Sequence, residues 1–152
     1  MLFAELLNNH HIWIAVFACA SAQALKVLTE YAYTKKLDRE LLFGTGGMPS
    51  SHSALVVAMA ASIGTVEGLG SPIFALSLIF AFIVMYDAAG VRRAAGKHAE
   101  VINDLVERLE NLGIKPAERL KELLGHSPIE VLAGAIWGII VSSLAHHWWV
   151  QI

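Results

Sequence analysis

The chain has 152 residues, of which 56% are hydrophobic and only 16% charged, and its mean hydropathy is +0.57. A soluble domain of this size has too much surface for so few charges, so the composition favours one membrane-embedded domain, residues 1–152. The net charge of −2 argues against a nucleic-acid partner, and a single cysteine excludes a disulfide framework.

Four segments are apolar enough to cross a bilayer as helices, which takes roughly 17–25 residues each. They run from about residue 11 to 33, 49 to 66, 72 to 91 and 128 to 149. The second and third are near the short limit, so one of them could instead be a helix buried inside the protein. The sequence predicts an all-α, integral-membrane helical bundle with about four membrane-crossing helices. Four crossings are few to enclose a site, which leaves a homodimer open.

Residues 98–125, between the third and fourth segments, have a different character. Apolar residues recur at helical spacing from Val101 to Leu109, opposite acidic residues, and predict an amphipathic helix that ends at Gly113. Residues 117–124 are typical of a second short helix. We expect this insertion to form an amphipathic cap on the bundle.

The basic residues indicate the orientation of the bundle. Ten of the eleven lysines and arginines lie in residues 34–48 and 92–127, which four crossings place on the same side of the membrane. Basic residues gather on the cytoplasmic side of membrane proteins. The sequence therefore predicts a multi-pass protein with residues 34–48, the cap and any site between them on the cytoplasmic face.

Residues 46–53 read Gly-Gly-Met-Pro-Ser-Ser-His-Ser. Glycines followed by proline at a first helical position present free backbone N–H groups, which bind anions. Gly47 would contribute such a group, and Ser50, Ser51 and His52 add side-chain donors. An ordinary loop and helix start is the alternative, but a histidine beside two serines at the membrane edge favours a functional role.

Residues 125–130 read Gly-His-Ser-Pro-Ile-Glu. Ser127 and Glu130 have the spacing of a capping box, with Pro128 at the first helical position, and this explains all three without any function. It does not explain His126, which is expected at the mouth of the bundle. A nearby carboxylate such as Glu130 can fix the tautomer of an imidazole and raise its basicity, as catalysis requires.

Basic side chains near the ends of the first and third segments complete the candidate site. Arg92 and Arg93 follow the third segment directly, and their planar donors suit a phosphate, although orientation alone would require only positive charge. Asp87 is expected to hold one of these arginines in place. Lys26 lies inside the first segment, where snorkelling to the interface is the alternative to binding phosphate.

The predicted topology brings these residues together. The first and third segments end, and the second and fourth begin, at the same membrane face. Two histidines, a lysine and arginines can therefore converge there and form a phosphoryl-transfer site that needs no metal and no cofactor. Cations would hold the transferring group while one histidine attacks it and the other protonates the leaving oxygen.

These motifs, in this order, resemble those of the divergent branch of the type 2 phosphatidic acid phosphatase superfamily, which is related to the vanadium-dependent haloperoxidases. With Gln23 and Lys26 included, the resemblance covers nearly the whole chain. It implies that His52, in Pro-Ser-Ser-His, is the general acid and that His126 attacks phosphorus. Glu130 stands where the superfamily usually has an aspartate.

The sequence departs from the superfamily pattern in its arginines. The first motif would place an arginine seven residues after Lys26, but Tyr33 stands there. The arginine expected six residues before the motif histidine is replaced by Leu120, and Arg119 is one position off. We therefore expect Arg92 or Arg93 to complete the phosphate site.

The resemblance implies an acid-phosphatase-type enzyme that hydrolyses a phosphomonoester or diphosphate lipid through a phosphohistidine intermediate. Phosphatidylglycerophosphate, phosphatidate and polyprenyl diphosphate are candidate substrates, and a cytoplasmic site favours the first. A non-catalytic anion-binding, lipid-binding or lipid-transport protein on the same bundle is the alternative. Nothing in the sequence favours vanadate-dependent halide oxidation.

Overall fold

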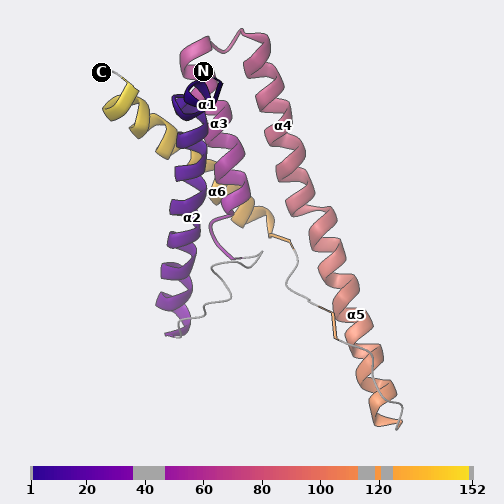
Figure 1. The fold of residues 1–152 in the computed structure, drawn as a ribbon. Coiled ribbons are helices and arrows are strands. Elements are labelled where there is room, and N and C mark those ends of the chain that lie inside the picture. The colour runs from indigo at the N-terminus through magenta and orange to yellow at the C-terminus, as the bar shows by residue number, and fades with distance from the viewer. Residues whose placement is uncertain (1, 36–46, 113–118, 121–124, 151–152) are drawn as a thin grey trace.

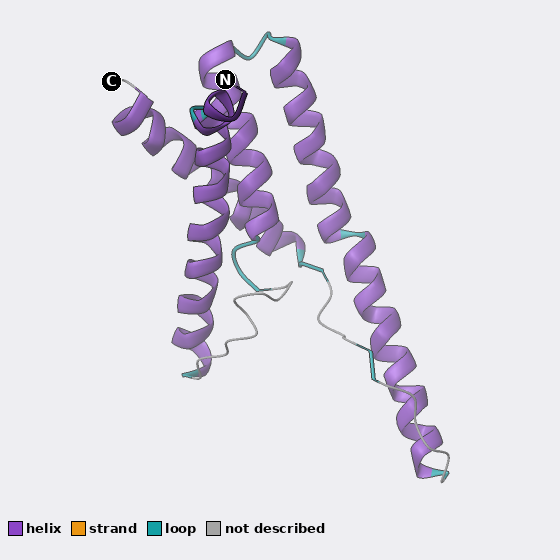
Figure 2. Cartoon of the chain, viewed as in Figure 1, coloured by secondary structure: helices purple, strands orange, loops and turns teal. Residues whose placement is uncertain are grey.

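The computed structural model describes residues 2–35, 47–112, 119–120 and 125–150, and these residues are helical with no strand (Figures 1 and 2). In chain order the elements are α1 (Leu2–Leu7), α2 (His10–Thr34), α3 (Ser51–Glu67), α4 (Pro72–Ala89), α5 (Val91–Asn111), α6 (Pro128–Ala145) and a π-helical turn, η2 (His146–Val150). The predicted all-α class is confirmed. The four predicted apolar segments correspond to α2, α3, α4 and α6 with η2.

Short polar signals set the starts of three of these helices. Ser50, Ser71 and Ser127 precede α3, α4 and α6, and each side chain accepts a hydrogen bond from the backbone N–H three residues further on. Such caps satisfy a donor that a helix start otherwise leaves unpaired. A proline occupies the first turn of α4 and of α6, where its missing N–H costs nothing.

Helix α3 lies at the centre of the bundle and packs against α2, α4 and α6. It runs antiparallel to α2 and α4 and parallel to α6 (Figure 1). Among the described residues, the helices long and apolar enough to span a membrane lie within residues 10–32, 72–111 and 128–148. Helix α3 has 17 residues, and its buried residues are spread along its whole length. The structure thus favours α3 as the short helix enclosed by the others.

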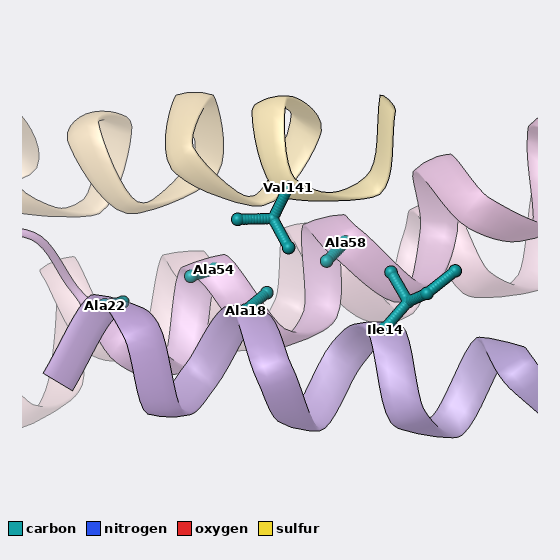
Figure 3. Close-up of a cluster of buried hydrophobic side chains, with 6 residues drawn as sticks. All are labelled: Ile14, Ala18, Ala22, Ala54, Ala58 and Val141. Atoms are coloured by element: carbon teal, nitrogen blue, oxygen red, sulfur yellow. The ribbon is translucent and has the colours of Figure 1, made fainter. Parts of the chain in front are cut away.

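Small residues allow the helices to pack closely. Gly134 and Gly138 of α6 face α3, where a Cβ at Gly134 would collide with the Ser50 carbonyl oxygen and one at Gly138 would lie 2.6 Å from that of Ala54. This is the small-xxx-small pattern that lets membrane helices approach each other. Beside it lies the buried cluster drawn in Figure 3, which consists of Ile14, Ala18, Ala22, Ala54, Ala58 and Val141.

The amphipathic helix begins earlier than the sequence predicted. We expected it within residues 98–113, but α5 begins at Val91 and continues the direction of α4 beyond the other helices (Figure 1). The hydrogen-bond ladder resumes across Gly90, whose N–H donates to Tyr86 (2.8 Å) and whose carbonyl accepts from Ala94 (2.9 Å). Arg92 therefore lies in the first turn of α5, directly beyond the end of α4.

The remainder of the predicted cap is described only in part. The second short helix, expected over residues 117–124, lies largely outside the described residues, and Arg119 and Leu120 are not helical. Asn103 of α5 holds the Leu120 backbone, donating to its carbonyl (2.7 Å) and accepting from its N–H (2.8 Å). These two residues therefore lie against the distal half of α5.

Candidate active site

Two histidines from distant parts of the chain meet where α3 and α6 begin. The rings of His52 and His126 are 6.2 Å apart between centroids and inclined at 73°. The backbone N–H of His126 donates to the Ala88 carbonyl at the end of α4 (3.1 Å). Gly125, at φ +96°, lies against the Arg93 backbone with no room for a Cβ. The turn that carries His126 is therefore docked on the α4–α5 junction.

The imidazole of His126 is buried and has no bonding partner. It is 3% exposed, and within the described part of the chain neither ring nitrogen has a hydrogen-bond partner. Burial is the main cause that lowers the pKa of His126 to about 4, with smaller contributions from Lys26, His52 and Arg92. At neutral pH this ring is therefore uncharged and keeps a free lone pair, as a nucleophile requires.

Asp87 and Arg92 form one wall of the space beside the histidines. The Arg92 Nε lies 2.7 Å from Asp87 Oδ2, so the expected role of Asp87 as an arginine holder is confirmed. Both residues line a cavity with His52, Ala88 and His126. Its volume is about 10 Å³, roughly the space of a single water molecule.

The structure brings only one of the three candidate arginines to the histidines. Arg93 is exposed and contacts the His126 turn through its backbone. Arg119 pairs with Glu110 at 3.3 Å. Glu110 lies eighteen residues beyond Arg92 on the same helix, roughly 27 Å along its axis at 1.5 Å per residue.

Lys26 does not snorkel out of the bundle. Its side chain is 1% exposed, and its stem packs against Gly47, where a Cβ would lie 3.0 Å from Cγ and Cδ. Gly47 has φ +83°, a conformation that favours glycine. The charge of Lys26 acts on His126, and that of Glu130 acts on Lys26. The lysine is thus held inside the bundle, facing the site.

The remaining candidate side chains bond within the bundle. Ser50 is buried and caps α3, and its N–H donates to the Glu130 carbonyl (3.0 Å). Ser51 is buried, and its side chain lies beside the thiol of Cys19. The Glu130 carboxylate accepts from the Ser127 N–H (3.0 Å), which completes the capping box. In this structure, therefore, Glu130 orders the start of α6 and does not bond to the His126 ring.

A second histidine cluster at the opposite end of the bundle was missed from the sequence. Ser62 of α3 lies 2.6 Å from His11 Nδ1 and 3.0 Å from His146 Nε2. The His10 ring lies 4.1 Å from that of His11 and 6.0 Å from that of His146. The predicted topology places the start of the first apolar segment, near His10 and His11, on the same side as the end of the fourth, near His146. This shared side was the signal that could have revealed the cluster. Within the described residues no group of three His, Cys, Asp or Glu side chains is placed to hold a metal ion.

The fold and the site define a helical membrane protein with a cation-flanked pair of histidines at one end of its bundle. The family model described as "Divergent PAP2 family" matches residues 7–141, and the chain belongs to this family. It is 46% identical over 149 residues to "Uncharacterized membrane protein YuiD" of Bacillus subtilis (strain 168), covering 91% of this chain and 94% of that protein. No solved structure matches the chain. The resemblance noted in the sequence motifs is confirmed.

Proposed function

We propose that this protein is a membrane phosphatase that removes phosphate from a lipid through a covalent intermediate on His126. The carrying observation is the burial of His126, whose imidazole has no hydrogen-bond partner among the described residues and lies beside a second histidine. A buried polar group without a partner costs free energy, so a site that retains one is suited to a ligand. Membership of the divergent PAP2 family supports the same reaction class.

The arrangement supports a two-step reaction. A ring nitrogen of His126 attacks phosphorus, the bond from phosphorus to the lipid oxygen breaks, and His52 gives its proton to that oxygen. Water then attacks the phosphohistidine, His52 takes a proton from it, and inorganic phosphate leaves with His126 restored. Lys26 and Arg92 stabilise the negative charge on the transferring group throughout.

A phosphoryl group needs more space than the cavity beside His126 provides. At about 10 Å³ the cavity holds roughly one water molecule, so the side chains around it must separate before substrate binds. His52 is exposed and the Arg92 side chain is 48% exposed, so both can move outward without displacing a helix. Arg92 contacts Asp87 through Nε, and its terminal nitrogens can then bind the phosphate.

The other candidate residues hold the elements that carry this site in place. Gly47 gives the Lys26 stem its space, and Ser50 and Glu130 join the starts of α3 and α6. Backbone N–H groups near Ser51 can bind phosphate at the start of α3. We assign Arg93 to headgroup contact at the membrane surface.

We propose a phosphomonoester or diphosphate lipid as the substrate, with phosphatidylglycerophosphate first, then phosphatidate and polyprenyl diphosphate. The site faces the cytoplasm in this proposal, because basic residues flank it. Cysteine labels at Lys35 and Leu69 in a Cys19-free background test this orientation. The first should react only from the cytoplasm and the second only from outside, and labelling of both from one side contradicts it.

A phosphate-release screen with purified protein across these lipid phosphates tests the proposed function, with His126→Ala as the control. Release by the wild type and not by the variant supports it. The alternative is a protein that binds anionic lipid without cleaving it. Saturable binding of a lipid phosphate with no release from any of them would favour that alternative.

A further inference from the structure

The bundle has an apolar groove between α2 and α6 that the proposed chemistry does not use. Its volume is about 450 Å³, and it is lined by Ile14, Phe17 and Ser21 on α2 and by Trp137, Val141 and Leu144 on α6. The Ser21 hydroxyl donates to Ala18 (3.1 Å) and accepts from the Trp137 N–H (3.0 Å). With these polar groups bonded to each other or to backbone, the groove offers hydrocarbon surface alone.

The near end of the groove lies roughly one and a half to two helical turns from the residues of the phosphate site. On α6, Glu130, Trp137 and Leu144 recur every seven residues and therefore share one face, with Glu130 at the end nearest the histidines. On α2, Ser21 lies five residues from Lys26, roughly 7–8 Å along the helix. The groove then follows α2 from Ser21 to Ile14, away from the site, for roughly 10 Å.

The groove also opens sideways toward the surrounding bilayer. Phe17 is 62% exposed and Leu144 is 54% exposed, so its rim is accessible along the length of the helices. A second hollow, of about 530 Å³, lies beside Asp87, but its lining residues all belong to the continuous α4–α5 helix. That hollow has one wall and cannot enclose a chain. A third hollow, of about 550 Å³ between α3, α4 and α6, is lined in part by the polar residues Thr65 and Ser143, whereas the α2–α6 groove offers hydrocarbon surface alone.

We propose that the groove between α2 and α6 holds a hydrocarbon chain of the lipid whose phosphate lies at His126. The inference rests on the proposed function for the place of the phosphate. It adds that the enzyme selects a lipid by the length of its chain. The bilayer is as apolar as the groove, so the chain gains position more than solvation when it enters. The groove thus aligns the headgroup with His126.

The test compares two bulky substitutions on the same helix. Leu144→Trp fills the far end of the groove, and Ile140→Trp adds the same bulk one turn away, at a position that does not line it. Phosphate release is measured from dipalmitoyl and dioctanoyl phosphatidic acid in mixed detergent micelles and from p-nitrophenyl phosphate. Thermal unfolding checks that each variant folds. If Leu144→Trp does not fold, Phe17→Trp on the opposite wall of the groove takes its place.

In the wild type, kcat/KM should be about tenfold higher for the dipalmitoyl than for the dioctanoyl lipid, because only the longer chain fills the groove and so fixes the position of the headgroup. Leu144→Trp should abolish this difference and leave p-nitrophenyl phosphate hydrolysis unchanged, while Ile140→Trp behaves as the wild type. Equal loss with both tryptophans, or loss with neither, overturns the groove assignment and leaves the phosphatase proposal intact.

A cross-linking experiment reads the groove without turnover. Phosphatidic acid with a diazirine at the end of one acyl chain should label α2 and α6 at the groove, and less so in Leu144→Trp. Labelling there without any phosphate release supports the groove while the phosphatase proposal fails. Labelling spread over the outer face of α4, or a link from the groove to a second copy of the chain, overturns the lipid assignment.

Discussion

Both ends of the bundle bury histidines, but the two clusters differ in what the imidazoles contact. At one end Ser62 lies within 3.0 Å of a ring nitrogen of His11 and of His146, and ties the starts and ends of three helices together. At the other end both ring nitrogens of His126 lack a partner among the described residues. His10 Nε2 also lacks one there, although its ring packs on two others.

The cations sharpen this difference. The charges of Lys26 and Arg92 act on His126, whereas within the described part of the chain the charge that acts on His146 is that of His10. A bonded histidine inside a membrane bundle stabilises its helices, whereas an unbonded one beside cations is suited to an anionic ligand. The comparison thus separates a hydrogen-bonded histidine cluster from one whose buried histidine is unbonded among the described residues and lies near two cations.

The largest expected difference between the two ends is in turnover. His126→Ala should reduce phosphate release by at least about a thousandfold, because the nucleophile is lost. It should also remove any acid-labile phosphoenzyme trapped from labelled substrate. His146→Ala, at another buried histidine, should keep a rate near that of the wild type. Comparable losses in both variants would contradict the separation of roles.

The next effect concerns the candidate arginines of the His126 site. Arg92→Lys should weaken transition-state binding by about 1.5–3 kcal/mol, because lysine lacks the planar pair of donors. Arg93→Lys and Arg119→Lys should be nearly silent, since neither side chain reaches the histidines in the structure. Values of kcat/KM for the three variants decide this. An inactive Arg119→Lys enzyme with an active Arg92→Lys enzyme would reverse the assignment.

At the end of the bundle where Ser62 bonds two histidines, the expected effect is on stability. Ser62→Ala removes the hydroxyl that bonds both His11 and His146, and leaving such buried groups unpaired costs about 1–3 kcal/mol. Thermal unfolding in detergent should show the loss, with little change in turnover. Thr65→Ala is the matched control, because that exposed hydroxyl donates only within α3, to Ala61 (2.9 Å).

The last expected effect is the pH dependence of stability. Since the folded pKa of His126 is about 4 and its ordinary value is 6.5, the unfolded chain binds more protons between these values. The contribution of His126 to stability is complete above about pH 6.5 and is lost as the pH falls toward 4. The melting temperature should therefore fall less steeply over this window in His126→Gln than in the wild type. Parallel curves would show that His126 is not buried in its neutral form.

The parts of the fold that could be predicted are those encoded in short stretches of chain. Apolar segments of span length located α2, α3, α4 and α6, and a serine cap or a proline marked the starts of the last three. The number of crossings then placed His52 and His126 at one end, because successive helices alternate in direction. The start of the amphipathic helix was not predicted, because residues 91–97 carry charge and yet continue the helix in line with α4.

The tertiary structure decided which side chains bond to which. Whether Glu130 faces His126 or the Ser127 N–H, and whether Arg92 or Arg119 reaches the site, depends on distances between helices remote in sequence. Those distances follow from the close contact of Gly134 with α3 and from the straight passage of α4 into α5. The sequence alone determined where the apolar helices start and which of their ends meet, since caps and span lengths act locally. Partner choice was left to packing, because it depends on ångström-scale separations that no local pattern carries.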